Sequence, residues 1–575
     1  MRKLIEVLPL QFRVLYRQFL LRVIDLEALS IQADVVGYLG QFAGILIFYS
    51  LIQAVGALFS TLGPPPTPQA LHIMAWHAEH SSIEIMMLVV GLISVITWDA
   101  TFPDRRDVMV LSPLPVASRT ILFAKIAASA SILALAILAL NFASSFAWSL
   151  VLAGMPDALR FLPAWWLAMI AASAFLYGSI LTLQGLAALL LPRRLFLRLS
   201  ATLQLAAFAL FLSAYFLEPS VLDPNLFSDP NNHWILASSP TYWFFALFNQ
   251  LNGTLPPQLA WLAQRATIGL AVVVTGAAAS LLLCYLHTMK KTVEQPDLIP
   301  GAGGSHRSPR FGSALQTAIV LFSFRSLTRS RQHRVVFAFY LSVVFAIALS
   351  LLASELSSTG HPPLREDFII PTLVMMSLAV VGLRAVFALP ISLTANWVLR
   401  TTQLSPSEKY IAATRRTMLL LAVVPVWLLS ALLSLSLRPW HHVLAHLAVL
   451  ALLGYIFAEL SLINFYKVPF TCSYLPGKTN IQVAFFGFIF VFLILAISFA
   501  PFEVRSLNDP ALFASTMGAF LTLAIALWLF NRHRARSAVL YFEELPEVLI
   551  QTLGLGAIRP SDADLPSGRI SAAGE

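Results

Sequence analysis

The chain has 575 residues, of which 58% are hydrophobic and 11% are charged, and its formal net charge is +9. Soluble domains contain about 45–50% apolar and about 25% charged residues, so this composition excludes a soluble globular protein and indicates a multi-pass membrane protein. In such a chain the positive charge marks cytoplasmic loops, and we expect no nucleic-acid partner. The two cysteines, Cys284 and Cys472, suggest neither a disulfide nor a metal cluster.

Residues 1–36 predict an amphipathic helix that lies in the cytoplasmic membrane interface. Apolar residues recur there at helical spacing, and arginines occupy the opposite side. The apolar positions are Phe12, Leu15, Tyr16, Phe19, Val23 and Leu26, and the arginines are Arg13, Arg17 and Arg22. A plainer interpretation is an anchor that only orients the first span.

Twelve stretches are long and apolar enough to cross a bilayer as helices, for which about 20 residues are needed. Their approximate limits are 38–61, 82–101, 120–153, 161–191, 199–217, 261–287, 335–353, 367–388, 416–437, 442–465, 480–500 and 511–530. The predicted fold is therefore all-α, a polytopic transmembrane helix bundle of about twelve spans.

The basic residues between these stretches fall mainly on one side. With the N-terminus in the cytoplasm, pairs such as Arg105 with Arg106 and Lys290 with Lys291 lie inside. The opposite loops hold only Arg160, Arg265, Arg365, Arg438 and Arg505. Since Lys and Arg are enriched in cytoplasmic loops, this pattern predicts a protein of the cell (inner or cytoplasmic) membrane with both termini cytoplasmic.

Residues 291–312, rich in Gly and Pro, predict a flexible cytoplasmic linker. The linker separates a first six-span half, 37–290, from a second half, 313–536. The second half begins with an interfacial segment and contains six further spans. A cytoplasmic and partly disordered tail, 537–575, follows it. A shift of 290 residues places Leu114 on Leu404 and Arg119 on Lys409. We interpret the two halves as a parallel internal repeat, as found in transporters.

A cytoplasmic turn follows the second span of each half, with the sequence LSPLPVASRTILFAK at 111–125 and LSPSEKYIAATRR at 404–416. In the second turn Ser405 is suited to cap a helix, Pro406 to occupy its first position, and Glu408 to complete a capping box. This helix is expected to begin in water.

The first turn leads into a long predicted helix. Pro115 or Ser118 opens it and it continues to about Leu152, which corresponds to roughly 50 Å and exceeds a hydrocarbon core of about 30 Å. Such a helix carries Arg119 and Lys125 below the membrane and can connect a cytoplasmic event to the span. The alternative is an ordinary inside loop with a helix cap.

The longest outer loop contains SSPTYWFFALFNQLNG at 238–253. Its aromatic residues favour the boundary between membrane and water, so a short helix that dips into the outer leaflet is expected. An aromatic belt without a further role remains an alternative.

Few ionisable residues fall deep inside the predicted spans, where burial of a charge is costly. Glu459 in the tenth span and Arg384 in the eighth are the candidates for a translocation path. Each has an alternative role, either extending its charge to the interface or pairing with a neighbour.

The histidines and nucleophiles give no catalytic or metal site. His442 and His446 have a spacing that can bind zinc, but no third ligand accompanies them at a defined spacing. We find no Ser-His-Asp pattern and no paired-carboxylate signature, and so predict no catalytic residue and no bound metal.

The organisation resembles that of permease subunits of type 2 ABC exporters. Six spans per unit, an interfacial helix before the first, an outer aromatic helix, and a turn of the form (D)xxxLxxLPVxxxxxxxxK carry this resemblance. Residues 107–125 match the turn well and residues 401–416 match it less well, with Ser405 where the first copy has Pro115. The rest of the chain is similar through topology only.

In that family the turn docks on an ATP-binding subunit, which implies an ATPase-coupling role for two groups of residues. These are Leu111, Leu114, Pro115, Ser118 and Arg119 in the first turn, and Leu404, Ser405, Pro406, Glu408 and Lys409 in the second.

The chain contains no GxxxxGK[ST] phosphate loop, so ATP is expected to act through a separate ABC ATP-binding subunit, with no cofactor bound by the chain itself. We expect a noncatalytic permease of an ATP-driven exporter, embedded in the lipid bilayer, working as a single-chain pseudo-dimer or as a homodimer. The alternatives are a secondary transporter driven by an ion gradient and a polytopic membrane enzyme or scaffold.

Overall fold

The computed structural model describes residues 10–24, 35–60, 67–98, 116–218, 226–227, 229–294, 309–357, 366–391, 401, 406–471 and 481–542. Throughout these ranges the regular structure is helical and no strand occurs, which confirms the predicted all-α class. Helices are expected of a chain in lipid because each satisfies its own backbone hydrogen bonds.

The first half contains one amphipathic helix, the long apolar helices and a short helical region between the last two of them. The elements are α2 (Leu10–Ile24), α3 (Val35–Phe59), α4 (Pro68–Ile96), α6 (Ser118–Asn141), α7 (Ser144–Trp148), a π-helical turn (Ser149–Ala153), α8 (Gly154–Leu190), α9 (Arg193–Leu217), α10 (His233–Ser238), α11 (Pro240–Asn252) and α12 (Ala260–Glu294).

The second half follows a similar order without a counterpart of α11. Its elements are α13 (Ala314–Arg329), α14 (Arg331–Ser357), α15 (Glu366–Phe387), α17 (Ser407–Met418), a π-helical turn (Leu419–Val423), α18 (Val424–Leu433), α19 (Trp440–Ser461), α20 (Ile481–Asn508) and α21 (Pro510–Ser537). The π-helical turn ends two residues before Pro425, which has no N–H to donate to the preceding turn of helix.

Ten helices in the described ranges are long and apolar enough to cross a membrane, so a multi-pass architecture is supported. The predicted count of twelve is not confirmed. The predicted span 199–217 corresponds to a shorter apolar segment, Thr202–Leu217. Residues 481–500 of the predicted span 480–500 lie in α20.

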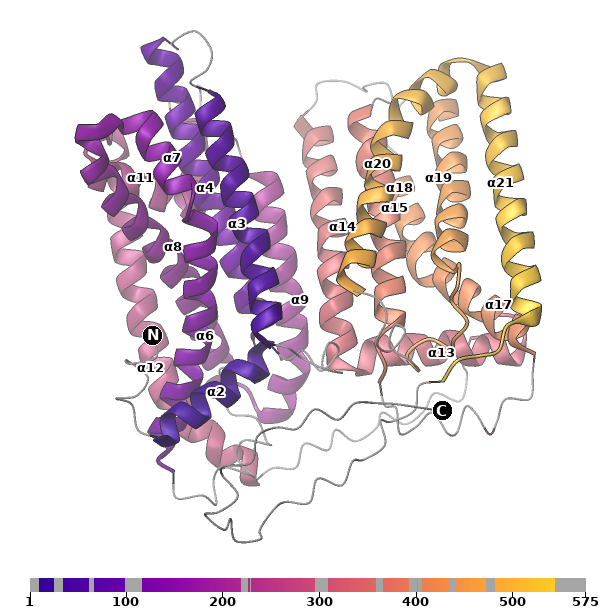
Figure 1. The fold of residues 1–575 in the computed structure, drawn as a ribbon, viewed down its shortest axis with the longest axis horizontal. Coiled ribbons are helices and arrows are strands. Elements are labelled where there is room, and N and C mark those ends of the chain that lie inside the picture. The colour runs from indigo at the N-terminus through magenta and orange to yellow at the C-terminus, as the bar shows by residue number, and fades with distance from the viewer. Residues whose placement is uncertain are drawn as a thin grey trace, which may run out of the picture.

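Two helical bundles stand side by side, with α9 and α14 between them (Figure 1). The rings of Phe208 on α9 and Phe339 on α14 lie 6.1 Å apart in an edge-on arrangement. Trp98 and Ala338 are buried in the same contact. The first half thus meets the second through its α9, while most other long helices keep an apolar face exposed, as expected of helices in contact with lipid.

In each half the amphipathic helix crosses the same end of the bundle and packs on the helix that follows the predicted cytoplasmic turn (Figure 1). In the first half α2 buries Leu15 and Phe19 against Ile121 of α6. In the second half α13 buries Ile319 against Tyr410 of α17. A helix therefore occupies residues 10–24 of the predicted amphipathic segment, and it covers a neighbouring helix.

The predicted continuous helix from Ser118 to about Leu152 is wrong. It ends at Asn141, and a turn at 142–143 separates it from α7 and the π-helical turn. The hydroxyl of Ser50 on α3 accepts hydrogen bonds from the backbone N–H groups of Ala143 and Ser144, each at 3.0 Å. Because these N–H groups are satisfied by a side chain of another helix, the break costs little.

The predicted domain limits fall close to helix ends. The helix α12 continues to Glu294, four residues beyond the predicted start of the linker at 291, and residues 295–308 lie outside the described ranges. Of the predicted tail, the stretch up to 542 is described, and Leu540 is buried against α13 and α17.

Candidate functional site

The residues predicted to couple to an ATPase are only partly described. Leu111, Leu114, Pro115, Leu404 and Ser405 lie outside the described residues. Of the others, Ser118 is the first residue of α6 and Pro406 is the N-cap of α17. Arg119 and Lys409 are exposed beside these two helix starts.

The first turn of α17 is bound to the last turns of α21. The Ser407 hydroxyl donates to the carbonyl oxygen of Ala535 at 2.7 Å. The Glu408 carboxylate accepts from Nε of Arg532 at 2.7 Å and from Nε of Arg536 at 3.3 Å. The helix begins at Ser407, one residue later than predicted, and Pro406 makes no side-chain cap bond. The N-cap is thus Pro406 and not Ser405 as predicted, and the Glu408 carboxylate binds α21.

Glu459 is fully buried and joins three helices. Its Oε1 lies 2.5 Å from Nε of Arg415, at the end of α17, and its Oε2 accepts from Nη2 of the same arginine at 3.3 Å. The side-chain amide of Asn531 on α21 donates to Oε2 at 2.8 Å and to the Glu459 carbonyl at 2.9 Å. Of the two interpretations open for Glu459, pairing with a neighbour is the one that this geometry favours.

Arg384, the second charged candidate, also meets the end of α19. Its Nε donates to the carbonyl of Ser461 at 2.7 Å, and its guanidinium carbon lies 4.3 Å from the ring centroid of Phe465. Arg384 and Glu459 thus lie near the same helix end, each with its own partners. Both act there as attachments between helices.

The first half has a different arrangement at the matching position. The shift of 290 residues places Lys125 on Arg415, and Lys125 is buried on α6 with its ammonium nitrogen 5.2 Å from the centroid of Phe19 on α2. Tyr16 on α2 and Ser131 on α6 share a hydrogen bond of 2.9 Å. In this half the basic residue therefore meets the amphipathic helix.

The amphipathic helix of the second half is fixed at its start by a capping box that we did not predict. The Ser313 hydroxyl accepts from the Gln316 N–H at 3.3 Å, and the Gln316 side chain accepts from the Ser313 N–H at 3.1 Å. The same Gln316 oxygen accepts from Nη1 of Arg416 at 3.1 Å. The pattern S-x-x-Q at 313–316 is the sequence signal that identifies this helix start.

A second buried polar cluster was also missed. His446 on α19 lies between Glu503 on α20 and Thr372 on α15, with Nδ1 2.7 Å from Glu503 Oε1 and Nε2 3.1 Å from Thr372 Oγ1. All three side chains are fully buried. The predicted eleventh span ended at 500 because the apolar run ends there, whereas α20 continues to Asn508 and places Glu503 inside the bundle.

The three side chains of this cluster are joined by hydrogen bonds. The Thr372 hydroxyl lies 2.8 Å from the Ile369 carbonyl, to which it can donate, and 3.1 Å from Nε2 of His446. Nδ1 of His446 and Oε1 of Glu503, 2.7 Å apart, share one proton in a short hydrogen bond. The other Glu503 oxygen, Oε2, is buried without a hydrogen-bond partner in the described part of the chain. The cluster is thus a hydrogen-bonded histidine and carboxyl pair buried inside the bundle.

The zinc interpretation of His442 and His446 gains no support from this geometry, because His446 is directed at Thr372 and Glu503. In the described ranges no group of three or more His, Cys, Asp or Glu side chains is placed to hold a metal ion. Comparison of the chain with protein-family models, with curated proteins and with solved structures finds no match.

Proposed function

We propose that the chain is the membrane-spanning permease of an ATP-driven exporter of the ABC type. A separate ATP-binding subunit docks at the turns before α6 and α17, and the chain supplies the path for the substrate without catalysing a reaction. The multi-pass helical fold fits this role, and the absence of a phosphate loop from the sequence requires the ATPase to be a second subunit.

The observation that carries the proposal is the way α17 is tied to two spans. At its start, Glu408 binds Arg532 on α21, and at its end, Arg415 binds Glu459 on α19. A force applied to the exposed start of α17 is therefore transmitted to α19 and α21 together. Rigid-body displacement of packed helices is a common way to open and close a path.

The first half supports the same role with other contacts. Its helix α6 begins at the equivalent turn and is packed by α2, as α17 is packed by α13. The contact between α9 and α14 supports a single chain that supplies both halves of the path. The exposed Arg119 and Lys409 suit a cytoplasmic location of both turns and, with them, of both termini.

The experiment is copurification of the full-length chain from its native membrane. We expect a subunit that contains a GxxxxGK[ST] loop, identified by mass spectrometry, and ATP hydrolysis in the purified complex. Combining Arg119→Glu with Lys409→Glu should lower the amount of this subunit at least tenfold, because a docking surface is sensitive to reversed charge. Arg329→Glu, which changes an exposed arginine of α13, is the matched control.

Two results would count against the proposal at different levels. If no subunit with a phosphate loop copurifies with the wild-type chain, the ATP-driven mechanism is wrong. If the double variant retains that subunit as well as the control does, the mechanism stands and the assignment of Arg119 and Lys409 is wrong.

A second candidate function is transport driven by a proton gradient, and the His446 cluster favours it. A shared proton between two fully buried groups is a feature of proton relays in transporters. This function predicts uptake into vesicles when a proton gradient is imposed without ATP. Uptake should be lost in Glu503→Gln and in Glu459→Gln, and should be unchanged in Glu366→Gln, which alters an exposed carboxylate at the start of α15.

A further inference from the structure

A cavity of about 600 Å³ lies in the first half, alongside α9. Its walls come from α4, α8, α9, α10 and the first residues of α11. We call it the α9 cavity. Small-molecule sites commonly have volumes of about 300–1,000 Å³ and mainly apolar walls with a few polar groups.

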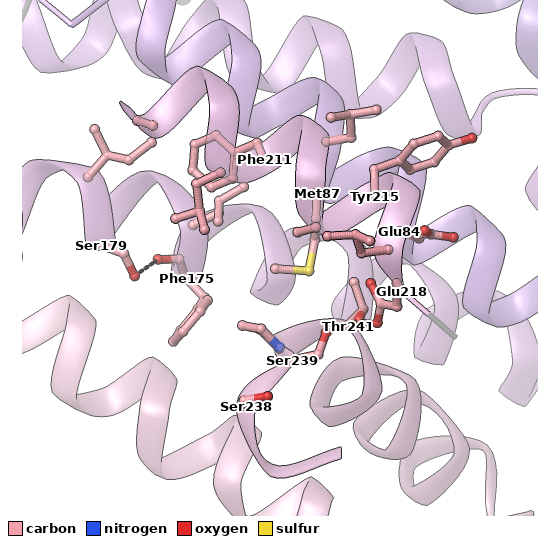
Figure 2. Close-up of a pocket in the computed structure, with 18 of the residues that line it drawn as sticks. Glu84, Met87, Phe175, Ser179, Phe211, Tyr215, Glu218, Ser238, Ser239 and Thr241 are labelled. Carbon is pink, nitrogen blue, oxygen red and sulfur yellow. Dashed lines mark hydrogen bonds between the residues drawn. The ribbon is translucent and has the colours of Figure 1, made fainter. Parts of the chain in front are cut away.

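The body of the α9 cavity is apolar. Met87 on α4, Phe175 on α8 and Phe211 on α9 face it, and the lining continues along α9 from Ala207 to Leu217 (Figure 2). At 1.5 Å per residue, this stretch of helix is about 15 Å long. The cavity therefore has room for an elongated or bulky apolar group.

One end of the α9 cavity is acidic. Figure 2 shows the carboxylates of Glu84 and Glu218 on the same side of the cavity, and the two groups repel each other electrostatically. Neither Lys nor Arg lines the cavity in the described part of the chain. Two acidic side chains at the end of an apolar chamber, with neither Lys nor Arg among its described lining residues, form a place where a cation is stabilised and favours the ionised form of both groups.

The two carboxylates differ in their partners. Glu218 is 5% exposed and accepts from the hydroxyls of Ser239 and Thr241, and it lies 3.5 Å from Nε2 of His80. Glu84 makes no hydrogen bond or ion pair with any described residue. Glu218 is thus fixed in position by its neighbours, while the carboxyl group of Glu84 is the one that a ligand can still bind.

We propose that the α9 cavity binds an amphipathic organic cation, with its charged head at Glu84 and Glu218 and its apolar body along α9. Such a ligand satisfies both parts of the cavity at once, since its body replaces water on the apolar wall and its head places a positive charge beside the two carboxyl groups. The inference goes beyond the proposed function, because binding requires neither ATP nor a second subunit.

The test uses two probes of the same shape and opposite charge, tetraphenylphosphonium and tetraphenylborate. Each is equilibrated with the full-length protein in lipid nanodiscs, and nanodiscs without protein correct for partition into lipid. We expect saturable binding of tetraphenylphosphonium and none of tetraphenylborate. Absence of tetraphenylphosphonium binding, or equal binding of both ions, overturns the proposal.

Variants locate the site. Glu84→Gln keeps the size of the side chain and should raise the dissociation constant for tetraphenylphosphonium about tenfold. Ser179→Trp, which fills the apolar end opposite the carboxylates, should abolish binding. Glu366→Gln is the control and should bind as the wild type does. An unchanged dissociation constant in Glu84→Gln overturns the proposal even if Ser179→Trp does not fold.

The outcome is independent of the coupling experiment. A chain that binds the phosphonium ion but copurifies with no ATPase retains this site and loses the proposed energy source. A chain that copurifies with an ATPase but does not bind the ion retains the proposed function and loses this site.

Discussion

The guanidinium of Arg415 lies 2.5 Å from the carboxylate of Glu459, which joins the last turn of α17 to a fully buried position on α19. Asn531 of α21 donates to the same carboxylate. One acidic side chain therefore holds α17 and two further long helices, α19 and α21, in a fixed relationship.

Removing one member of this pair should be more harmful than removing both. Arg415→Met takes away the cation on a buried carboxylate, which typically costs about 3–5 kcal/mol. The double variant Arg415→Met with Glu459→Gln leaves no lone charge and should lose less stability. Unfolding of the purified proteins in mixed micelles measures both. Arg416→Met, at the exposed neighbouring position, is the control, and an equal loss in this control would contradict the prediction.

The contact between α17 and α21 can be tested by crosslinking. With Cys284 and Cys472 replaced by alanine, a chain carrying Ser407→Cys and Ala535→Cys should crosslink within one molecule when treated with a short thiol reagent, because Ser407 binds the Ala535 carbonyl. The pair Ser407→Cys with Ser515→Cys should not react. Ser515 stands 20 residues earlier on α21, about 30 Å away along the helix. Equal crosslinking of the two pairs would show that α17 is not held at this end of α21.

The break after α6 depends on a single hydroxyl. Ser50→Ala leaves the N–H groups of Ala143 and Ser144 without the acceptor that the structure gives them, and a buried donor without a partner costs about 1–3 kcal/mol. A loss of stability in this range is expected in the same unfolding assay. Ser94→Ala, a buried serine that only donates to the Val90 carbonyl of its own helix, should cost less.

Close contact between α8 and α12 requires a small residue at 185. A Cβ added at Gly185 would overlap the side chain of Ser280 on α12, so Gly185→Val should separate the two helices and reduce the yield of folded protein. At Gly56 of α3 an added Cβ meets nothing within 4 Å, and Gly56→Val should be tolerated. Size-exclusion chromatography in detergent distinguishes the two, and similar profiles would contradict the close approach.

The helical class and most spans could be predicted because apolar runs alone decide where a helix can lie in lipid. The starts of two helices, α6 at Ser118 and α17 near Pro406, could also be predicted, since turn and capping residues mark them. The end of α6 could not be predicted, because the acceptor for the Ala143 N–H at this break is Ser50, which is 93 residues away in sequence. Side chains that act across helices leave no local pattern.

The buried polar sites were only partly predictable for the same reason. Glu459 stood out as a charge inside an apolar run, but its partners Arg415 and Asn531 could not be deduced from spacing. Glu503 was passed over because it follows the apolar run, although α20 carries it inward. The α9 cavity could not be foreseen at all, since its walls come from five separate elements.

The link between α20 and α21 consists of Asp509 alone, whereas α9 and α12 are separated by the segment that carries α11 and closes one end of the α9 cavity. The second half therefore has no length of chain between its last two spans from which to build such a closure. Each polypeptide consequently has one such binding site near α11. At saturation, binding should approach one phosphonium ion per polypeptide chain.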